Sequence, residues 1–135
     1  MPDPGTTRIL VIDDDRNFRD LLRLHLTAMG YQVQVADDGV TGGRALLADV
    51  PDLIISDVNM PFLDGLELLS LLRADESTAA IPVILLSGRS DGDTAAKAVE
   101  LGAADFLTKP VTRDQLLDSI GACLTRAKNR IAPPG

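Results

Sequence analysis

Five side chains in this sequence have the chemical types needed to handle phosphate. They are three carboxylates, one hydroxyl and one ammonium group: Asp13, Asp14, Asp57, Ser87 and Lys109. Carboxylates packed together repel one another unless a cation neutralises them, and hard oxygen ligands suit Mg²⁺ above all. A metal beside a carboxylate and a lysine supports phosphoryl transfer, in which charge neutralisation and positioning do most of the catalysis. If folding gathers these groups, the sequence predicts a metal-dependent phosphate site centred on Asp57.

Short apolar runs alternate with amphipathic helical patterns along the chain, and this alternation would position the five side chains. Strands are expected at 9–12, 31–36, 53–57, 83–86 and 105–108, and helices at 18–29, 40–48, 66–72, 94–101 and 116–127. Such regular alternation predicts an α/β fold, with a parallel sheet and helices on both of its faces. The carboxyl ends of parallel strands share one edge of the sheet, so the five polar groups are expected there.

Length and charge narrow the class of protein. The 135 residues fit one domain, and the net charge of −7 argues against non-specific binding of nucleic acid or of an anionic membrane. We see no signal peptide and no apolar run of membrane-spanning length, which makes the cytoplasm the expected compartment. The folded domain is expected over 8–128. Residues 1–7 are expected to form a flexible tail, and residues 129–135 a second tail or the start of a linker.

Four motifs together resemble the receiver domain of two-component response regulators. They are IDD at 12–14, ISDVNMPFLDG at 55–65, LLSG at 85–88 and FLTKP at 106–110. Each motif alone is modest, but all four in this order at predicted strand ends are highly specific, and the resemblance extends over about residues 8–126. It implies a flavodoxin-like, doubly wound (βα)5 fold whose five parallel strands lie in the order 2-1-3-4-5.

The same resemblance assigns a phosphorylation site and a metal site. Asp57 would be the phospho-acceptor, attacking a phosphohistidine on a partner protein to give an aspartyl phosphate. Mg²⁺, or Mn²⁺ in its place, would be held by side-chain oxygens of Asp14 and Asp57 and by the backbone carbonyl of Asn59. Asp13 would act on the metal through a bound water.

Lys109 and Ser87 receive catalytic roles from the resemblance. Lys109 would pair with Asp57 before transfer and with a phosphate oxygen after it, and Ser87 would donate a hydrogen bond to another phosphate oxygen. The bond between Lys109 and Pro110 resembles a peptide bond that is usually cis in this family.

The switch and the phosphate lifetime are also assigned by resemblance. Ser87 would move inward on phosphorylation, and Phe106 would turn into the space that the hydroxyl leaves. Phe106 stands where a tyrosine is frequent, so its buried state gains no phenolic hydrogen bond. Asn59 and Arg89 match the two positions that flank the path of the attacking water and tune how long the phosphate lasts.

The expected partners follow from these roles. A sensor histidine kinase or a histidine phosphotransfer protein would supply phosphate, and a downstream effector domain or protein would read the face formed by the fourth helix, the fifth strand and the fifth helix. Dimerisation on phosphorylation is common among relatives. No direct nucleic-acid or membrane binding is expected, and the chain would be no enzyme beyond catalysing its own phosphorylation and dephosphorylation.

Two other functions and one ambiguity of register stay open. A degenerate receiver would act as a docking module without phosphorylation, although the complete set of acids, hydroxyl and lysine argues against this. A phosphohydrolase would usually carry a second acid two residues after its nucleophile, where this chain has Asn59. The metal pair could be Asp14 and Asp15, but the apolar run ending at Ile12 favours Asp13 and Asp14, which leaves Asp15 as a helix N-cap.

Overall fold

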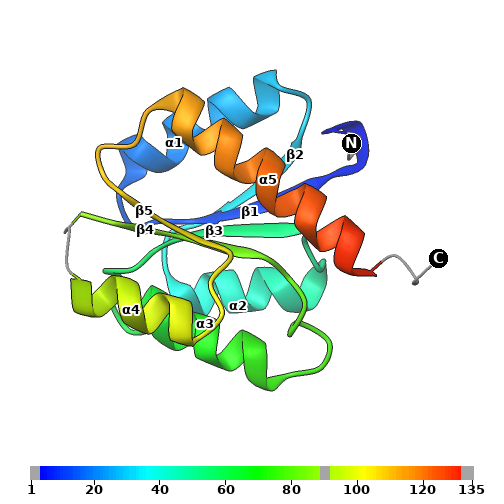
Figure 1. The fold of residues 1–135 in the computed structure, drawn as a ribbon. Helices are drawn as coiled ribbons and strands as arrows, with labels where there is room; N and C mark the ends of the chain where they lie inside the picture. The colour runs from blue at the N-terminus through cyan, green and yellow to red at the C-terminus, as the bar shows by residue number, and fades with distance from the viewer. Residues whose placement is uncertain (1–3, 89–91, 132–135) are drawn as a thin grey trace.

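The computed structural model describes residues 4–88 and 92–131, with strands and helices alternating along the chain (Figure 1). After a short 3-10 turn, η1, the elements are η1 (Pro4–Thr6), β1 (Arg8–Ile12), α1 (Arg16–Ala28), β2 (Gln32–Ala36), α2 (Gly39–Ala48), β3 (Leu53–Asp57), α3 (Gly65–Ala74), β4 (Val83–Ser87), α4 (Gly92–Glu100), β5 (Asp105–Thr108) and α5 (Arg113–Ile131). None of the helices within these described ranges is long and apolar enough to cross a bilayer.

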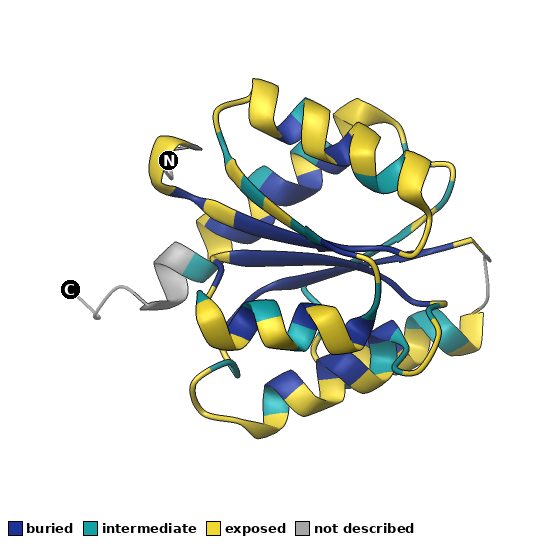
Figure 2. Cartoon of the chain, turned by 180° about the vertical axis from the view of Figure 1, so that it is seen from behind, coloured by how far each residue is buried: buried dark blue, intermediate teal, exposed yellow. Residues whose placement is uncertain are grey.

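The five strands form one parallel sheet in the order β2-β1-β3-β4-β5, which confirms the predicted topology. Helices α1 and α5 cover one face of the sheet, and α2, α3 and α4 cover the other (Figure 1). A strand with helices on both sides buries both rows of its side chains. This explains why β3 and β4 are apolar along most of their length and are buried at every position (Figure 2).

Each face of the sheet has its own aliphatic core. Under α1 and α5 the core contains Ile9, Val11, Leu22, Leu26, Ile55, Ile84, Leu116 and Ile120. Under α2, α3 and α4 it contains Leu10, Ile12, Leu46, Ile54, Leu69, Val83, Leu85 and Ala98. Alternate residues of each central strand therefore anchor opposite helical layers, and this fixes where the strand ends lie.

Among the described residues, the side chains of Asp15, Asp38 and Asp64 cap the amino ends of α1, α2 and α3. Asp15 caps α1 and accepts from the backbone N–H groups of Asn17 at 3.0 Å and Phe18 at 3.3 Å. Asp64 caps α3 in a capping box with Glu67. The N-cap role expected for Asp15 is confirmed, and it separates this residue from the acids before it.

Gly5 and Thr7 are hydrogen-bonded to β2, within the segment 1–7 that the sequence predicts to be a flexible tail. Thr7 is buried, and its carbonyl oxygen accepts from the backbone N–H of Gln32 at 3.0 Å. The side chain of Gln32 donates to the carbonyl of Gly5 at 3.0 Å. At the other end of the chain α5 continues to Ile131, beyond the boundary expected at 128. The first difference arises from hydrogen bonds to β2, and the second from the continuation of α5 past residue 128. Local composition indicates neither.

Candidate functional site

The carboxyl edge of the sheet gathers the five polar side chains. Asp57 and Ser87 are the last residues of β3 and β4, while Asp13 and Lys109 directly follow β1 and β5. The strands are closely aligned at this edge, where Ile12 pairs with Ser56, Asp57 with Leu86, and Ser87 with Thr108. Groups from four strands, far apart in sequence, therefore end on one small surface.

Three carboxylates form the centre of the site. Oxygens of Asp13, Asp14 and Asp57 lie within 4.8 Å of one another. Asp13 and Asp57 are only 1% and 6% exposed, whereas Asp14 is exposed to solvent. The cluster thus has a buried floor of two acids and a third acid at its solvent side.

Lys109 brings one positive charge to this cluster. Its Nζ donates to Asp13 Oδ2 at 3.0 Å and lies 3.7 Å from Asp57 Oδ1. The sequence predicted the pair with Asp57, but the shorter contact to Asp13 was not foreseen. The backbone N–H of Lys109 also donates to the carbonyl of Ser87 at 2.7 Å, and the bond from Lys109 to Pro110 is cis, as the resemblance implied.

Asp13 is held by contacts on several sides. Its Oδ1 accepts from the backbone N–H of Asp15 at 2.9 Å, while its other oxygen faces Lys109. Its own N–H donates to the carbonyl of Ala36 at 3.1 Å, and its carbonyl accepts from the guanidinium of Arg19 at 2.9 Å. Asp13 therefore has little freedom, and its contact with Lys109 holds that ammonium beside Asp57.

The carboxyl of Asp57 has an abnormally high proton affinity. Burial is the largest cause and raises its pKa to about 6 from 3.8, with further upward contributions from the charges of Asp13 and Asp14. The ammonium of Lys109 and the backbone N–H of Asn59 oppose this rise without cancelling it. One cation is therefore too little for three acids, and the electrostatics favour a second.

The donor set fits a hard divalent cation. All three converging side chains offer carboxylate oxygens, the ligands that Mg²⁺ prefers, and Asp14 leaves the group open to solvent on one side. Mg²⁺ keeps several water ligands in most protein sites, so an open side suits it better than a closed cage. Within the described residues no other group of three or more His, Cys, Asp or Glu side chains converges in this way.

A glycine brings helix α3 against the backbone of Asp57. The backbone N–H of Gly65 donates to the carbonyl of Val58 at 2.9 Å, and a Cβ on Gly65 would lie 2.5 Å from the carbonyl oxygen of Asp57. Only glycine permits this approach. Between them, Phe62 takes a φ of 71° and is almost fully exposed, so the connecting loop includes a conformation that is rare for a large side chain.

The remaining predicted residues lie around this centre. Ser87 is buried at 1% exposure, and Asn59 is exposed in the loop after β3. Phe106 is half-buried and packs on the core beneath α2, α3 and α4. Arg89 lies outside the described residues.

One neighbour of the site was missed from the sequence. The Nζ of Lys109 lies 4.4 Å from the centroid of the Phe18 ring. The sequence predicts only that Phe18 begins the helix expected at 18–29. The available signal was its position: it lies in the first turn of the helix that follows the acids, at the same edge of the sheet.

Comparison with known proteins gives independent evidence on the family of this chain. The family model described as the response regulator receiver domain matches residues 9–121. The C4-dicarboxylate transport transcriptional regulatory protein DctD of Pseudomonas aeruginosa is 42% identical over 91% of this chain, and the response regulator MprA of Mycobacterium ulcerans is 39% identical over 91%. The chain spans only 26% of DctD and 52% of MprA.

Solved structures agree with the family match. A response regulator receiver domain protein from Clostridium thermocellum superposes with a TM-score of 0.85 at 31% identity, covering 93% of this chain and 99% of that one. The chemotaxis response regulator CheY4 of Vibrio cholerae superposes with a TM-score of 0.81 at 27% identity, covering 87% and 98%. Both neighbours match almost from end to end, so the likeness concerns the whole fold.

Proposed function

The chain belongs to the response regulator receiver domain family, and we propose that it accepts a phosphoryl group on Asp57 from a phosphohistidine. The observation that carries the proposal is the meeting of Lys109 with two buried carboxylates, Asp13 and Asp57, at the end of the sheet. A buried acid beside a fixed amine is costly to maintain as a structural feature, but it suits a carboxylate that must react.

The transfer balances as a displacement at phosphorus. An oxygen of the Asp57 carboxylate forms a bond to phosphorus while the phosphorus–nitrogen bond of the phosphohistidine breaks. The bonding pair goes to the imidazole nitrogen, which leaves a neutral histidine on the partner after proton uptake. The Nζ of Lys109 lies 3.7 Å from Asp57 Oδ1. Its positive charge would stabilise the carboxylate before transfer and the negative charge on the phosphate oxygens during and after it.

Asp14 and Asp57 would hold Mg²⁺, or Mn²⁺, through side-chain oxygens, with the backbone carbonyl of Asn59 as a third ligand and Asp13 acting through a water. When bound, the ion neutralises charge on the phosphoryl oxygens. Burial, and after it the charges of Asp13 and Asp14, raise the pKa of Asp57, and a bound cation would favour its ionised form, which is the nucleophile.

Ser87 and Phe106 are the proposed switch residues. Ser87 ends β4, the strand paired with the one that Asp57 ends, and its hydroxyl would donate to a phosphate oxygen on that carboxylate. Phe106 pairs with Leu85 on the next strand and is half-buried, so its ring has one apolar side to move toward. Asn59 and Arg89 are proposed to set the lifetime of the phosphate.

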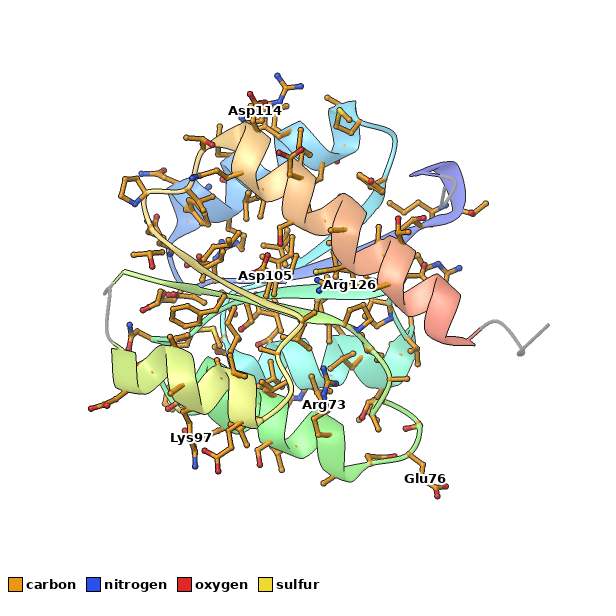
Figure 3. All side chains as sticks on the ribbon, in the orientation of Figure 1. Arg73, Glu76, Lys97, Asp105, Asp114 and Arg126 are labelled. Atoms are coloured by element: carbon orange, nitrogen blue, oxygen red, sulfur yellow. The ribbon has the colours of Figure 1, made fainter. Side chains whose placement is uncertain are left out.

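The face that reports the change is proposed to comprise α4, β5 and α5. Lys97 of α4, Asp105 at the start of β5 and Arg126 of α5 come from these three elements (Figure 3). Asp105 accepts from the hydroxyl of Ser119 at 2.6 Å, and Arg126 donates to the carbonyl of Ala104 at 3.2 Å. Polar links of this kind hold α5 on β5 and would shift with it.

We place the domain between two protein partners in the cytoplasm. A sensor histidine kinase or a histidine phosphotransfer protein would supply the phosphate, and an effector domain or protein would bind the altered face, with dimerisation on phosphorylation as one form of output. The domain would catalyse only its own phosphorylation and dephosphorylation and turn over no separate substrate.

A labelling experiment tests the acceptor. The wild type is incubated with Mg²⁺ and radiolabelled acetyl phosphate, from which acetate leaves as the Asp57 oxygen binds phosphorus. The variants are Asp57→Asn and, as a matched control for lost charge, Asp52→Asn, whose residue precedes β3 at the opposite end. We expect stable label on the wild type and on Asp52→Asn, and none on Asp57→Asn.

Three results would contradict this reading in different ways. Label on Asp57→Asn would move the acceptor elsewhere. Repeated turnover of acetyl phosphate with no lasting label would indicate a phosphohydrolase. A folded wild type that takes up no label, and that gains no thermal stability from Mg²⁺, would indicate a docking module without phosphorylation.

A further inference from the structure

The ammonium of Lys109 has an aromatic neighbour that none of the roles above uses. Its Nζ lies 4.4 Å from the centroid of the Phe18 ring, 3.0 Å from Asp13 Oδ2 and 3.7 Å from Asp57 Oδ1. An ammonium over the face of an aromatic ring is attracted by the ring quadrupole, and the attraction grows as water is excluded. The side chain of Lys109 is 22% exposed, so much of the water around this contact has been removed.

The ammonium of Lys109 is surrounded by the Phe18 ring and by the carboxylates of Asp13 and Asp57. A lysine ammonium has three N–H groups and no acceptor, and its four-carbon stem has many rotamers. Asp13 and Asp57 together offer oxygens to it, but the contact at 3.7 Å is too long for a strong hydrogen bond. Asp13 therefore holds one N–H of the ammonium, and the ring face restricts the position of the rest of the group.

Phe18 is itself held in place. Its backbone N–H donates to Asp15 Oδ1 at 3.3 Å, which ties it to the segment that carries Asp13 and Asp14. Its ring packs on the core beneath α1 and α5 and lines a cavity of about 60 Å³ together with Leu21 and Leu116. A ring fixed to both the acidic segment and the core is a rigid surface for the lysine.

We propose that Phe18 is a positioning residue for Lys109, whose ring face holds the ammonium against Asp13 and Asp57 so that it meets the incoming phosphoryl group. The proposal rests on Asp57 being the acceptor. In this role Phe18 acts through the lysine alone. The effect of Phe18 on phosphorylation should therefore depend on its aromatic ring. An aliphatic side chain of similar size would fill the space but would have no quadrupole to attract the ammonium.

The test compares two substitutions at this position with a neighbouring control. Phe18→Leu keeps an apolar side chain but removes the ring, and Phe18→Tyr restores the ring. Leu21→Ala alters the same cavity from a half-exposed position and serves as the packing control. Two quantities are measured in the full chain: the initial rate of labelling by acetyl phosphate with Mg²⁺, and the NMR shifts of the Lys109 side-chain protons, which the ring current of Phe18 displaces.

We expect labelling of Phe18→Leu to be about three- to tenfold slower than that of the wild type. Phe18→Tyr and Leu21→Ala should stay within about twofold of the wild type, since the ring face persists in both. The displaced Lys109 shifts should be present in the wild type, Phe18→Tyr and Leu21→Ala and absent in Phe18→Leu.

Two results would overturn the inference. One is a Phe18→Leu protein that labels at the wild-type rate or retains the displaced shifts. The other is equal slowing in Phe18→Leu, Phe18→Tyr and Leu21→Ala, which would assign the effect to packing of the cavity. If the wild type itself takes up no label, the proposed acceptor fails, and the NMR shifts alone decide whether the ring holds the lysine.

Discussion

At the amino end of the sheet, Arg8 forms an ion pair with Asp49, and its backbone N–H donates to Asp52 at 2.9 Å, all on the surface. At the carboxyl end, Asp13 and Asp57 are buried together with Asp14 beside them, and Lys109 faces this group with a single charge. Both edges belong to the same sheet, yet the charged groups at the amino edge lie in water, whereas two of the acids at the carboxyl edge are buried.

The contrast separates what holds the fold from what performs its chemistry. Exposed ion pairs contribute about 0–1 kcal/mol each to the free energy of unfolding. The charged groups at the amino end therefore contribute little to stability, and their removal should cost little. Burial of a carboxylate lowers stability, and like charges beside it add to the cost; both raise the pKa of Asp57, burial more than the neighbouring acids. The carboxyl end is therefore maintained at the expense of stability, and changes there should have larger consequences than changes at the amino end.

The largest effect on folding should come from closing the space beside the acceptor. Gly65→Ala places a methyl group 2.5 Å from the carbonyl oxygen of Asp57, against backbone that must move. We expect the free energy of unfolding to fall by about 3 kcal/mol, measured by urea denaturation. Gly43→Ala, in a helix where no atom lies within 4 Å of the added Cβ, should raise it by about 0.5–1 kcal/mol. Equal effects at the two glycines would contradict the close approach at the site.

The next effect depends on pH. Because the folded state raises the pKa of Asp57 from 3.8 to about 6, it favours the protonated carboxyl. The stability due to this group is fully present below pH 3.8 and is lost as the pH rises through 6. Without metal, the wild type should lose on the order of 2–3 kcal/mol across this window relative to Asp57→Asn, measured by urea denaturation at several pH values.

Saturating Mg²⁺ provides the control for this pH dependence. A bound cation favours the ionised carboxylate, so the pH-dependent difference between wild type and Asp57→Asn should shrink when the metal is added. A difference that stays constant from pH 4 to 7 in the absence of metal would show that burial and the neighbouring acids do not raise the proton affinity of Asp57.

Binding of Mg²⁺ should depend on the acids at the carboxyl end of the sheet and not on those at the amino end. The expected change in stability is smaller than the two above. A ligand that binds only the folded state stabilises it by about 1.4 kcal/mol at ten times its dissociation constant. We expect Mg²⁺ to raise the melting temperature of the wild type and of Asp52→Asn, which removes an acid at the amino end. Asp14→Asn, which removes an acid of the cluster, should lose most of the increase. An undiminished increase in Asp14→Asn would remove that residue from the metal site.

The smallest effect is expected at the amino end. Arg8→Gln removes the charge that pairs with Asp49 but keeps most of the side-chain stem and the backbone donor to Asp52. Both partners of the pair are about half exposed, so the free energy of unfolding should change by less than about 1 kcal/mol in urea. A loss of more than 2 kcal/mol would show that this end holds the sheet together more strongly than its exposure suggests.

The fold followed from the sequence because its patterns are local. Runs such as Ile9–Ile12 and Val83–Leu86 are short, aliphatic and followed by polar residues, and each became a buried strand. The acids before α1 were also assigned to different roles, since a run that ends at Ile12 puts Asp13 and Asp14 at the strand end and leaves Asp15 to cap the helix. Strand ends in a parallel sheet share one edge, which made the meeting of these residues predictable.

What the sequence could not provide were contacts whose geometry depends on packing. Lys109 and Asp13 are 96 residues apart, and nothing local indicates that the lysine lies closer to Asp13 than to Asp57. The aromatic contact of Phe18 likewise depends on how α1 sits on the sheet. Thr7 was assigned to a tail because Pro and Gly precede it, although its carbonyl bonds to β2.

The burial of β3 and β4 along their whole length has a consequence for how the proposed phosphorylation of Asp57 could affect the rest of the domain. Asp57 is attached to the part of the domain that opens least, so backbone amides inside these two strands should exchange with deuterated solvent only when the entire domain unfolds. Phosphorylation should leave their exchange kinetics governed by that global event. Changes in exchange should instead concentrate in the segments that follow the two strands, where the rigid interior meets the surface of the domain.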